Sequence, residues 1–240
     1  MSDSQAKALA HIAVNEPEKL KDKEACRSAL KDNPSVDQAL FGRMVASDPS
    51  LNYDAAAQVA HAISTHRVQN EFDYFTAVDD LSPKDDAGAG HLGTVEFNSS
   101  TLYRYATVNV EELFLSLGES TAAAVRNFVD AFVYSMPTGK QNTFANRTLP
   151  ELVYVTVRCD QPVNFAGAFE QPVPVDSMGG YVASSVKRMT EYAGKVYKNY
   201  ADVPVRAWIV GAETEGAVTL PLPELLKTVE AFLGEELSKG

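Results

Sequence analysis

Apolar residues recur every three to four positions in several parts of the chain, the spacing that places them on one face of a helix. This spacing runs through residues 4–31, where Pro17 interrupts it, and through residues 181–200. It also predicts helices at residues 111–137 and 222–237. The pattern therefore predicts helices at both ends of the chain and between them.

Other segments alternate apolar and polar residues and are rich in Val, Thr, Tyr and Phe, which is typical of strands. Residues 94–110 have this pattern, with an expected bend near Asn98. Residues 152–158 and 205–213 are expected to form further strands. Because strands and helices alternate after residue 94, the sequence predicts an α/β or α+β domain.

Two segments in the first third of the chain are harder to assign. Residues 36–47, which contain FGRMVAS, alternate and are interpreted as a strand. In residues 55–68 the alanines of the first half favour a helix, whereas the alternation of the second half favours a strand. Arg43 could contact a phosphate and Met44 a base. The pattern favours the commoner roles of a surface charge and a core methionine.

A connection of about 20 residues, DYFTAVDDLSPKDDAGAGHL at residues 73–92, joins two strand-like segments, and connections of that length are usually functional or disordered. Tyr74 and Phe75 lie at its start and Leu92 at its end, so in a hairpin the three side chains would meet across the strands. They would form either an apolar cluster that holds the hairpin shut or a wedge that inserts between bases. The pattern alone favours the cluster.

A metal-dependent phosphohydrolase would need convergent ligands, for which the candidates are His61, His66, Asp79, Asp80 and His91. Their spacing matches no HxH, HExxH or HxxxH motif, and the aspartates stand among Ser, Pro, Lys and Gly, which are typical of a solvated loop. The glycine-rich DAGAGHLG precedes a strand rather than a helix, so it does not predict a phosphate-binding loop. We therefore expect no metal and no cofactor.

The charge balance argues against a free-standing nucleic-acid binder, which is usually basic. The 240 residues include 21 Lys and Arg against 32 Asp and Glu, a formal net charge of −11. Cys26 and Cys159 belong to no CxxC motif or Cys/His cluster, which excludes a recognisable zinc site or disulfide framework and favours a reducing cytoplasm. No segment has the apolar run of a signal peptide or a membrane span, so we expect no membrane partner.

Three long stretches of the chain strongly resemble the CasC family, the backbone subunit of the type I-E CRISPR surveillance complex Cascade. They are ALFGRMVAS, QVAHAISTHRVQNEFDYFTAVDDL and AGHLGTVEFNSSTLYRYATVNV, and weaker similarity continues through TGKQNTFANRTLPELVYV and NFAGAFEQPV. The resemblance covers most of the chain from residue 36 onward.

The resemblance implies an antiviral-defence scaffold that binds crRNA and has no active site. It implies an α+β fold with an RRM-like (ferredoxin-like) palm, helical fingers and a protruding β-hairpin thumb. Copies are expected to stack head to tail along the crRNA as a helical oligomer, together with other Cascade subunits. The thumb of one copy would lie over the palm of the next and interrupt base stacking, so that the guide pairs with target DNA in segments.

By motif, residues 1–35 correspond to a remnant of the helical fingers. Residues 36–240 correspond to the palm, into which the thumb hairpin is inserted at residues 66–96. Family members begin with a palm strand and a Lys/Arg-rich segment, for which this sequence offers no match. The resemblance thus implies a palm that is incomplete at its N-terminus, and it offers an account of the negative charge.

The resemblance also assigns RNA contacts. Within the thumb, the residues that match positions beside the displaced nucleotide are Tyr74, Phe75, Thr76 and Leu92. The family usually has Trp where Tyr74 stands, and Tyr offers a smaller stacking face. In the palm, Met44 matches a residue that packs against a base, with Arg43 beside it.

Two alternatives to the full scaffold remain. One is a metal-dependent nuclease that uses His61, His66, Asp79 and His91. The other is a chain that binds RNA only weakly by itself, because few phosphate contacts remain, and whose unpaired sheet edge favours dimers or aggregates.

Overall fold

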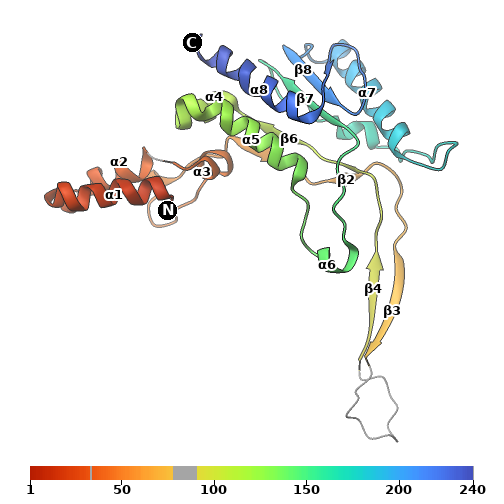
Figure 1. The fold of residues 1–240 in the computed structure, drawn as a ribbon, viewed down its shortest axis with the longest axis horizontal. Coiled ribbons are helices and arrows are strands. Elements are labelled where there is room, and N and C mark those ends of the chain that lie inside the picture. Colours follow the sequence, from red (N-terminus) through yellow and green to blue (C-terminus); the bar gives the residue numbers. More distant parts are fainter. Residues whose placement is uncertain (33, 78–90, 240) are drawn as a thin grey trace, which may run out of the picture. The chain divides into compact units, whose positions relative to one another are not determined.

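The computed structural model describes residues 1–32, 34–77 and 91–239 and confirms an α+β fold, with small sheets (Figure 1). The chain forms two compact units. Unit 1 consists of Met1–Ala60, Tyr105–Pro162 and Pro204–Gly240, and unit 2 consists of His61–Arg104 and Val163–Val203. None of the helices in the described residues is long and apolar enough to cross a membrane.

The helices predicted at the N-terminus are confirmed in unit 1. Helix α1 (Asp3–Asn15) begins at a capping box, in which Ser2 and Gln5 each bond the other's backbone N–H. Pro17 ends this helical run and begins the 3₁₀ helix η1 (Pro17–Lys21). Helix α2 (Lys23–Lys31) follows, and the Asp22 carboxylate caps it by accepting a hydrogen bond from the Glu24 N–H at 2.9 Å.

The strand predicted at residues 36–47 is wrong, because its first half is the helix α3 (Val36–Phe41). Ser35 and Gln38 form a second capping box, and this local signal outweighs the alternation. Gly42, at φ +75°, ends the helix. A Cβ at Gly42 would lie 2.9 Å from the Tyr53 carbonyl oxygen. The turn therefore requires glycine both for its positive φ and for this close contact.

The helix favoured for the first half of residues 55–68 is also wrong. Ala57–Val59 form strand β1, which pairs antiparallel with β6 (Ala106–Val108). Ala57 is buried in the core, where its small side chain lets the strand lie close to the helices. Strand pairing and burial thus override the helix propensity of alanine.

The second half of that segment does contain a strand, β2 (Ile63–Ser64), which pairs with β5 (Leu102–Tyr103) in unit 2. The strand pattern predicted for residues 94–110 is interrupted near Asn98, where a bulge or bend was expected. Residues 98–101 carry no strand structure and separate the preceding strand from β5.

Unit 1 has a core to which two sheets, helix α3 and three longer helices contribute. The longer helices are α4 (Val110–Leu117), α5 (Thr121–Tyr134) and α8 (Leu222–Leu237), with the 3₁₀ turn η3 (Gly118–Ser120) between the first two. Strands β7 (Val153–Val157), β8 (Arg206–Val210) and β9 (Val218–Thr219) form a separate sheet, antiparallel between β7 and β8 and parallel between β8 and β9. Residues of β1, β6, β7 and β8 all pack against one core cluster, which includes Trp208, Leu225 and Val229.

No strand pairing joins the β1–β6 sheet to the β7–β8–β9 sheet in the residues that the structure describes. Two short helical turns complete unit 1, η2 (Pro49–Leu51) and α6 (Gln141–Phe144).

Unit 2 is built around helix α7 (Val182–Asn199), which packs against the 3₁₀ helix η4 (Phe165–Phe169). Phe165 meets the rings of Tyr192 and Tyr197 edge to face, with centroids 6.5 and 5.9 Å away. Gly167 lies directly under Tyr192, and a Cβ there would be 3.0 Å from the ring carbon that carries the hydroxyl. This apolar base carries the hairpin described below.

Two leucines of α4 provide a test of the unit 1 core, because Leu113 is 1% exposed and Leu115 is 82% exposed. Leu113→Ala leaves a cavity, and we expect it to lower the free energy of unfolding by about 2–5 kcal/mol. Leu115→Ala, the matched control, is expected to change it by less than about 0.5 kcal/mol. Urea unfolding measures both changes. Equal losses of unfolding free energy in the two variants would contradict the placement of Leu113 in the core.

Candidate nucleic-acid interface

A two-stranded antiparallel hairpin in unit 2 carries most of the predicted site residues. Strand β3 (Glu71–Ala77) pairs with β4 (His91–Phe97) over its whole length (Figure 1). Every side chain of β3 is exposed, and no residue of β4 is buried. Because they are exposed, the apolar side chains of the hairpin are available to a partner. A two-stranded hairpin of this kind is only marginally stable in water by itself.

The pairing register assigns each side chain to one of two faces, since neighbours along a strand point to opposite sides. Tyr74 is opposite Thr94 and Thr76 is opposite Leu92, so these four share one face. Phe75 is opposite Gly93 on the other face. The prediction that Tyr74 and Phe75 both meet Leu92 is therefore wrong for Phe75, whereas Tyr74 and Leu92 are diagonal neighbours.

The sequence prediction also missed Phe72, which is exposed on the same face as Tyr74 and Leu92. Period-two counting from Tyr74 would have found it. Phe72, Tyr74 and Leu92 together give this face three large apolar side chains, which we call the aromatic face.

Phe75 lies flat against its own hairpin. A Cβ on Gly93 would be 2.7 Å from the Phe75 Cε1 atom, so only glycine leaves room for the ring. The His91 ring lies beside it, with centroids 5.8 Å apart. Phe75 is accordingly 44% exposed, against 70% for Tyr74. The sequence signal for this packing, which the prediction missed, is a glycine paired with an aromatic residue of the neighbouring strand.

His66 fixes the root of the hairpin. Its Nε2 accepts a hydrogen bond from the Thr101 N–H at 3.1 Å, so the proton belongs on Nδ1, which donates to the Arg67 carbonyl at 2.9 Å. The imidazole stacks on the Tyr181 ring at 3.7 Å and 9°. The chain entering the hairpin, the chain leaving it and the start of α7 are thus joined at one buried side chain.

A second pair of contacts supports this root. The Thr65 N–H donates to the Thr101 carbonyl at 2.9 Å, and Oγ of Ser185 in α7 lies 2.8 Å from the Thr65 Oγ1. Thr65 and Ser185 are both buried.

The same geometry weighs against the metal-dependent alternative. Both ring nitrogens of His66 are already used, so it cannot bind a metal without breaking the hairpin root. His61 is exposed and Asp79 lies outside the described residues. Among residues 1–32, 34–77 and 91–239, no three His, Cys, Asp or Glu side chains gather where they could hold a metal ion.

Met44 is presented by a tightly held loop in unit 1. Arg43 and Tyr53 exchange both backbone hydrogen bonds, at 3.0 Å each, and close the loop at its ends. The Val45 N–H donates to the Asn52 Oδ1 at 2.7 Å. Met44 stands between these two fixed positions and is 83% exposed. A mobile side chain on a fixed backbone is well suited to packing against a flat partner.

The guanidinium of Arg43 turns toward the interior of unit 1, where its Nη1 donates to the Gln5 Oε1 at 3.3 Å. The side chain is half-buried. The RNA contacts of Arg43 and of the other five site residues stay predictions.

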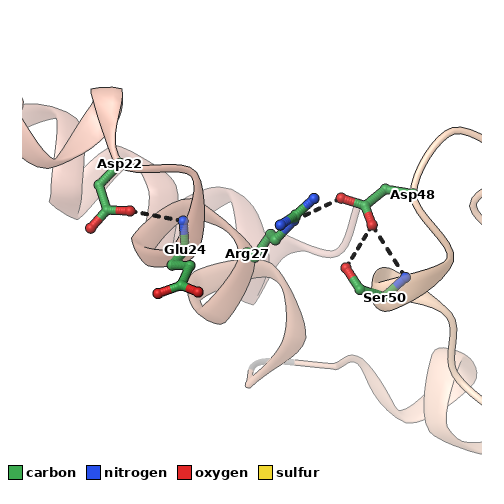
Figure 2. A network of polar contacts seen from close by, with 5 residues as sticks. All are labelled: Asp22, Glu24, Arg27, Asp48 and Ser50. Carbon is green, nitrogen blue, oxygen red and sulfur yellow. Dashed lines mark hydrogen bonds and ion pairs between the residues drawn. The ribbon is translucent and has the colours of Figure 1, made fainter.

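Helix α2 holds the far end of the same loop (Figure 2). The Arg27 Nε donates to the Asp48 Oδ2 at 2.8 Å, while the Ser50 hydroxyl and N–H donate to the Asp48 Oδ1 at 2.6 and 3.2 Å. The Ser50 hydroxyl and, next to it, the Arg27 guanidinium lower the pKa of the Asp48 carboxyl from its ordinary value.

The hairpin strands are acidic. Their charged side chains are Glu71, Asp73 and Glu96, and residues 71–77 and 91–97 contain no Lys or Arg. Phosphates are therefore repelled from the strands, and attraction to a nucleic acid would have to come from contact with the bases.

The hairpin root can be tested with two histidines. His66→Ala removes the acceptor for the Thr101 N–H and the ring that stacks on Tyr181. We expect faster hydrogen–deuterium exchange of the Thr101 amide and of β3 and β4, with α8 unchanged. His61→Ala, at an exposed histidine, is the control. Unchanged exchange in His66→Ala would show that other contacts hold the root.

The loop clamp in Figure 2 predicts a titration. Because the Asp48 pKa is lowered in the folded chain, its stabilising effect is present above the ordinary carboxyl pKa and is lost as the pH falls through the lowered value. Ser50→Ala is expected to raise the Asp48 pKa toward its ordinary value, as measured by NMR titration of the carboxyl carbon. Ser47→Ala should leave it unchanged, and an unaltered pKa in Ser50→Ala would refute the assignment.

Comparisons with known proteins place most of the chain in one family. The profile of the family described as "CT1975-like protein" matches residues 1–231. A comparison with curated proteins finds no match.

Among solved structures, a chain of a "CRISPR RNA-guided surveillance complex, pre-nicking" is 32% identical, with a TM-score of 0.79 over 95% of this chain and 67% of that chain. A chain of a "CRISPR RNA-guided surveillance complex" is also 32% identical, with a TM-score of 0.73 over 96% of this chain and 85% of that chain. The chain therefore belongs to the CT1975-like protein family and is a member of the Cascade backbone subunits that its central motifs resemble.

Proposed function

We propose that this chain is a non-enzymatic backbone subunit that binds crRNA and oligomerises head to tail along it in a type I-E Cascade complex in the cytoplasm. The observation that carries the proposal is the β3–β4 hairpin, whose large apolar side chains are exposed on both faces. In a member of a surveillance-complex family, such an arm needs a partner that buries aromatic and aliphatic side chains. The bases of a guide RNA are such a partner.

The hairpin then acts as the thumb. Its aromatic face offers Tyr74 and Leu92 to one base, while Phe75 on the opposite face meets the next. A two-sided wedge of this kind separates neighbouring bases and interrupts their stacking. Each stacking contact contributes about 1–3 kcal/mol. The guide would pair with target DNA in the segments between successive thumbs.

The charge distribution supports contact with bases rather than with phosphates at the thumb. Glu71, Asp73 and Glu96 repel the RNA backbone from the hairpin strands. The proposed phosphate contacts must then lie elsewhere in the assembly, on neighbouring copies or other Cascade subunits. A chain with a net charge of −11 is accordingly expected to bind RNA weakly by itself.

Unit 1 supplies the remaining parts in this proposal. Helices α1 and α2 correspond to the fingers, and the two sheets with their covering helices correspond to an RRM-like palm. Met44, on the loop that follows α3, is the palm side chain that packs against a base. Its 83% exposure and the fixed backbone on both sides support this role.

The thumb can be tested by replacing side chains on both of its faces. Phe75→Ala combined with Leu92→Ala is expected to weaken assembly of the chain on guide RNA by about fivefold or more, because at least one stacking contact is lost. Electrophoretic mobility of a fluorescein-labelled single-stranded RNA, with the chain added at low salt, measures the assembly.

Tyr200→Ala is the matched control, since Tyr200 is an exposed aromatic residue of the same unit outside the hairpin. Unchanged assembly in the double variant would refute the thumb. The labelled RNA is also expected to stay intact with Mn²⁺ present. Cleavage that disappears in His91→Ala would favour the nuclease instead.

A further inference from the structure

Gln5 is a buried polar residue on a helix whose other residues all remain at least partly exposed. The exposed fraction of Gln5 is 0%. A buried amide is costly unless its donors and acceptor are satisfied. Its four partners come from four different segments of unit 1.

The amide of Gln5 is a hub for hydrogen bonds. Its Oε1 accepts from the Ser2 N–H at 2.9 Å, from the Gln38 Nε2 at 3.4 Å and from the Arg43 Nη1 at 3.3 Å. Its Nε2 donates to the Leu30 carbonyl at 2.5 Å. One side chain thereby ties the start of α1 to the end of α2, to α3 and to the loop that presents Met44.

These contacts close a circuit around the loop. Arg43 exchanges backbone hydrogen bonds with Tyr53. The Tyr53 hydroxyl donates at 3.0 Å to the Leu30 carbonyl, the same oxygen that Gln5 reaches, and it also contacts the Lys31 carbonyl. Burial raises the pKa of this hydroxyl, so it stays a donor at neutral pH. The circuit therefore runs from Gln5 through Arg43 and Tyr53 to Leu30 and back to Gln5.

Met44 is the residue that this circuit positions. It follows Arg43 directly, and its own side chain takes no part in the network. The position of its backbone depends on the Arg43–Tyr53 pairing, which both ends of the circuit hold against α1 and α2. A small displacement of Arg43 would move Met44 away from a base by a comparable amount, which is enough to lose a packing contact.

We propose that Gln5 is a positioning residue for the RNA contact of Met44 and acts through Arg43. The inference rests on the proposed function, because it assumes that Met44 packs against a base. It gives the inward Arg43 side chain a role other than phosphate binding, and it makes helices α1 and α2 supports of the loop that carries Met44.

The experiment compares five variants of the full chain by fluorescence anisotropy of a fluorescein-labelled single-stranded RNA at low salt, where binding is strongest. Gln5→Leu keeps the size of the side chain and removes its hydrogen bonds. It is expected to weaken binding about as much as Met44→Ala does, roughly fivefold or more, the loss expected for one base contact.

The combined variant Gln5→Leu with Met44→Ala is expected to bind as weakly as either single variant, because the two changes remove the same contact. Gln5→Glu keeps the acceptor oxygens beside Arg43 but lacks the donor to the Leu30 carbonyl, so its binding is expected to lie between that of the wild type and that of Gln5→Leu. Met178→Ala, at a methionine that is 93% exposed in unit 2, is the control for Met44→Ala. Additive losses in the combined variant, or wild-type binding by Gln5→Leu, would overturn the proposal.

A second measurement needs no RNA and tests the anchoring of the loop by Gln5 separately from the RNA contact of Met44. Hydrogen–deuterium exchange at the hydrogen-bonded amides of Arg43, Val45 and Tyr53 is expected to quicken in Gln5→Leu and to remain slow in Met44→Ala. If Met44→Ala binds RNA as the wild type does, the proposed RNA contact fails, and the positioning proposal falls with it even though the exchange result still identifies Gln5 as the anchor of the loop. Unchanged exchange in Gln5→Leu overturns the anchoring directly.

Discussion

The antiparallel pairing of β3 with β4 is the constraint on which the proposed activity depends. The pairing register decides which side chains share a face, and a slip of β3 by one residue would move Tyr74 to the face opposite Leu92 and bring Phe75 to the face of Leu92. The hairpin cannot secure this register by burying one face, because it buries no residue. The contacts at its root, above all those of His66, and the close fit of Phe75 on Gly93 therefore have to hold it.

Much of the fold could be predicted from residue patterns, because long amphipathic helices and apolar strands carry strong local signals. The regions later found as α7, α8, β7 and β8 were predicted close to their observed limits. The errors lie in short segments. At residues 36–41 a capping box overrode alternation, and at Ala57 pairing with β6 overrode the preference of alanine for helices.

The site was predicted less completely, for reasons of the same kind. A pattern that places Tyr74 beside Phe75 in sequence does not place them on one face, and the partner strand fixes which residue each one meets. Gln5 carried a visible signal in its capping box with Ser2, but its contacts with Arg43 and Leu30 depend on the packing of α1 against α2 and the loop. Such long-range contacts leave no periodic trace in the sequence.

The fit of Phe75 against Gly93 has a consequence for how sequences of this family can vary. The space above the glycine is the space that the ring occupies, so the volumes of the two side chains are coupled across the strands. A relative with a larger residue at the position of Gly93 would need a smaller one at the position of Phe75, or a ring swung away from the sheet. The two positions, which lie 18 residues apart in the chain, should therefore vary as a pair.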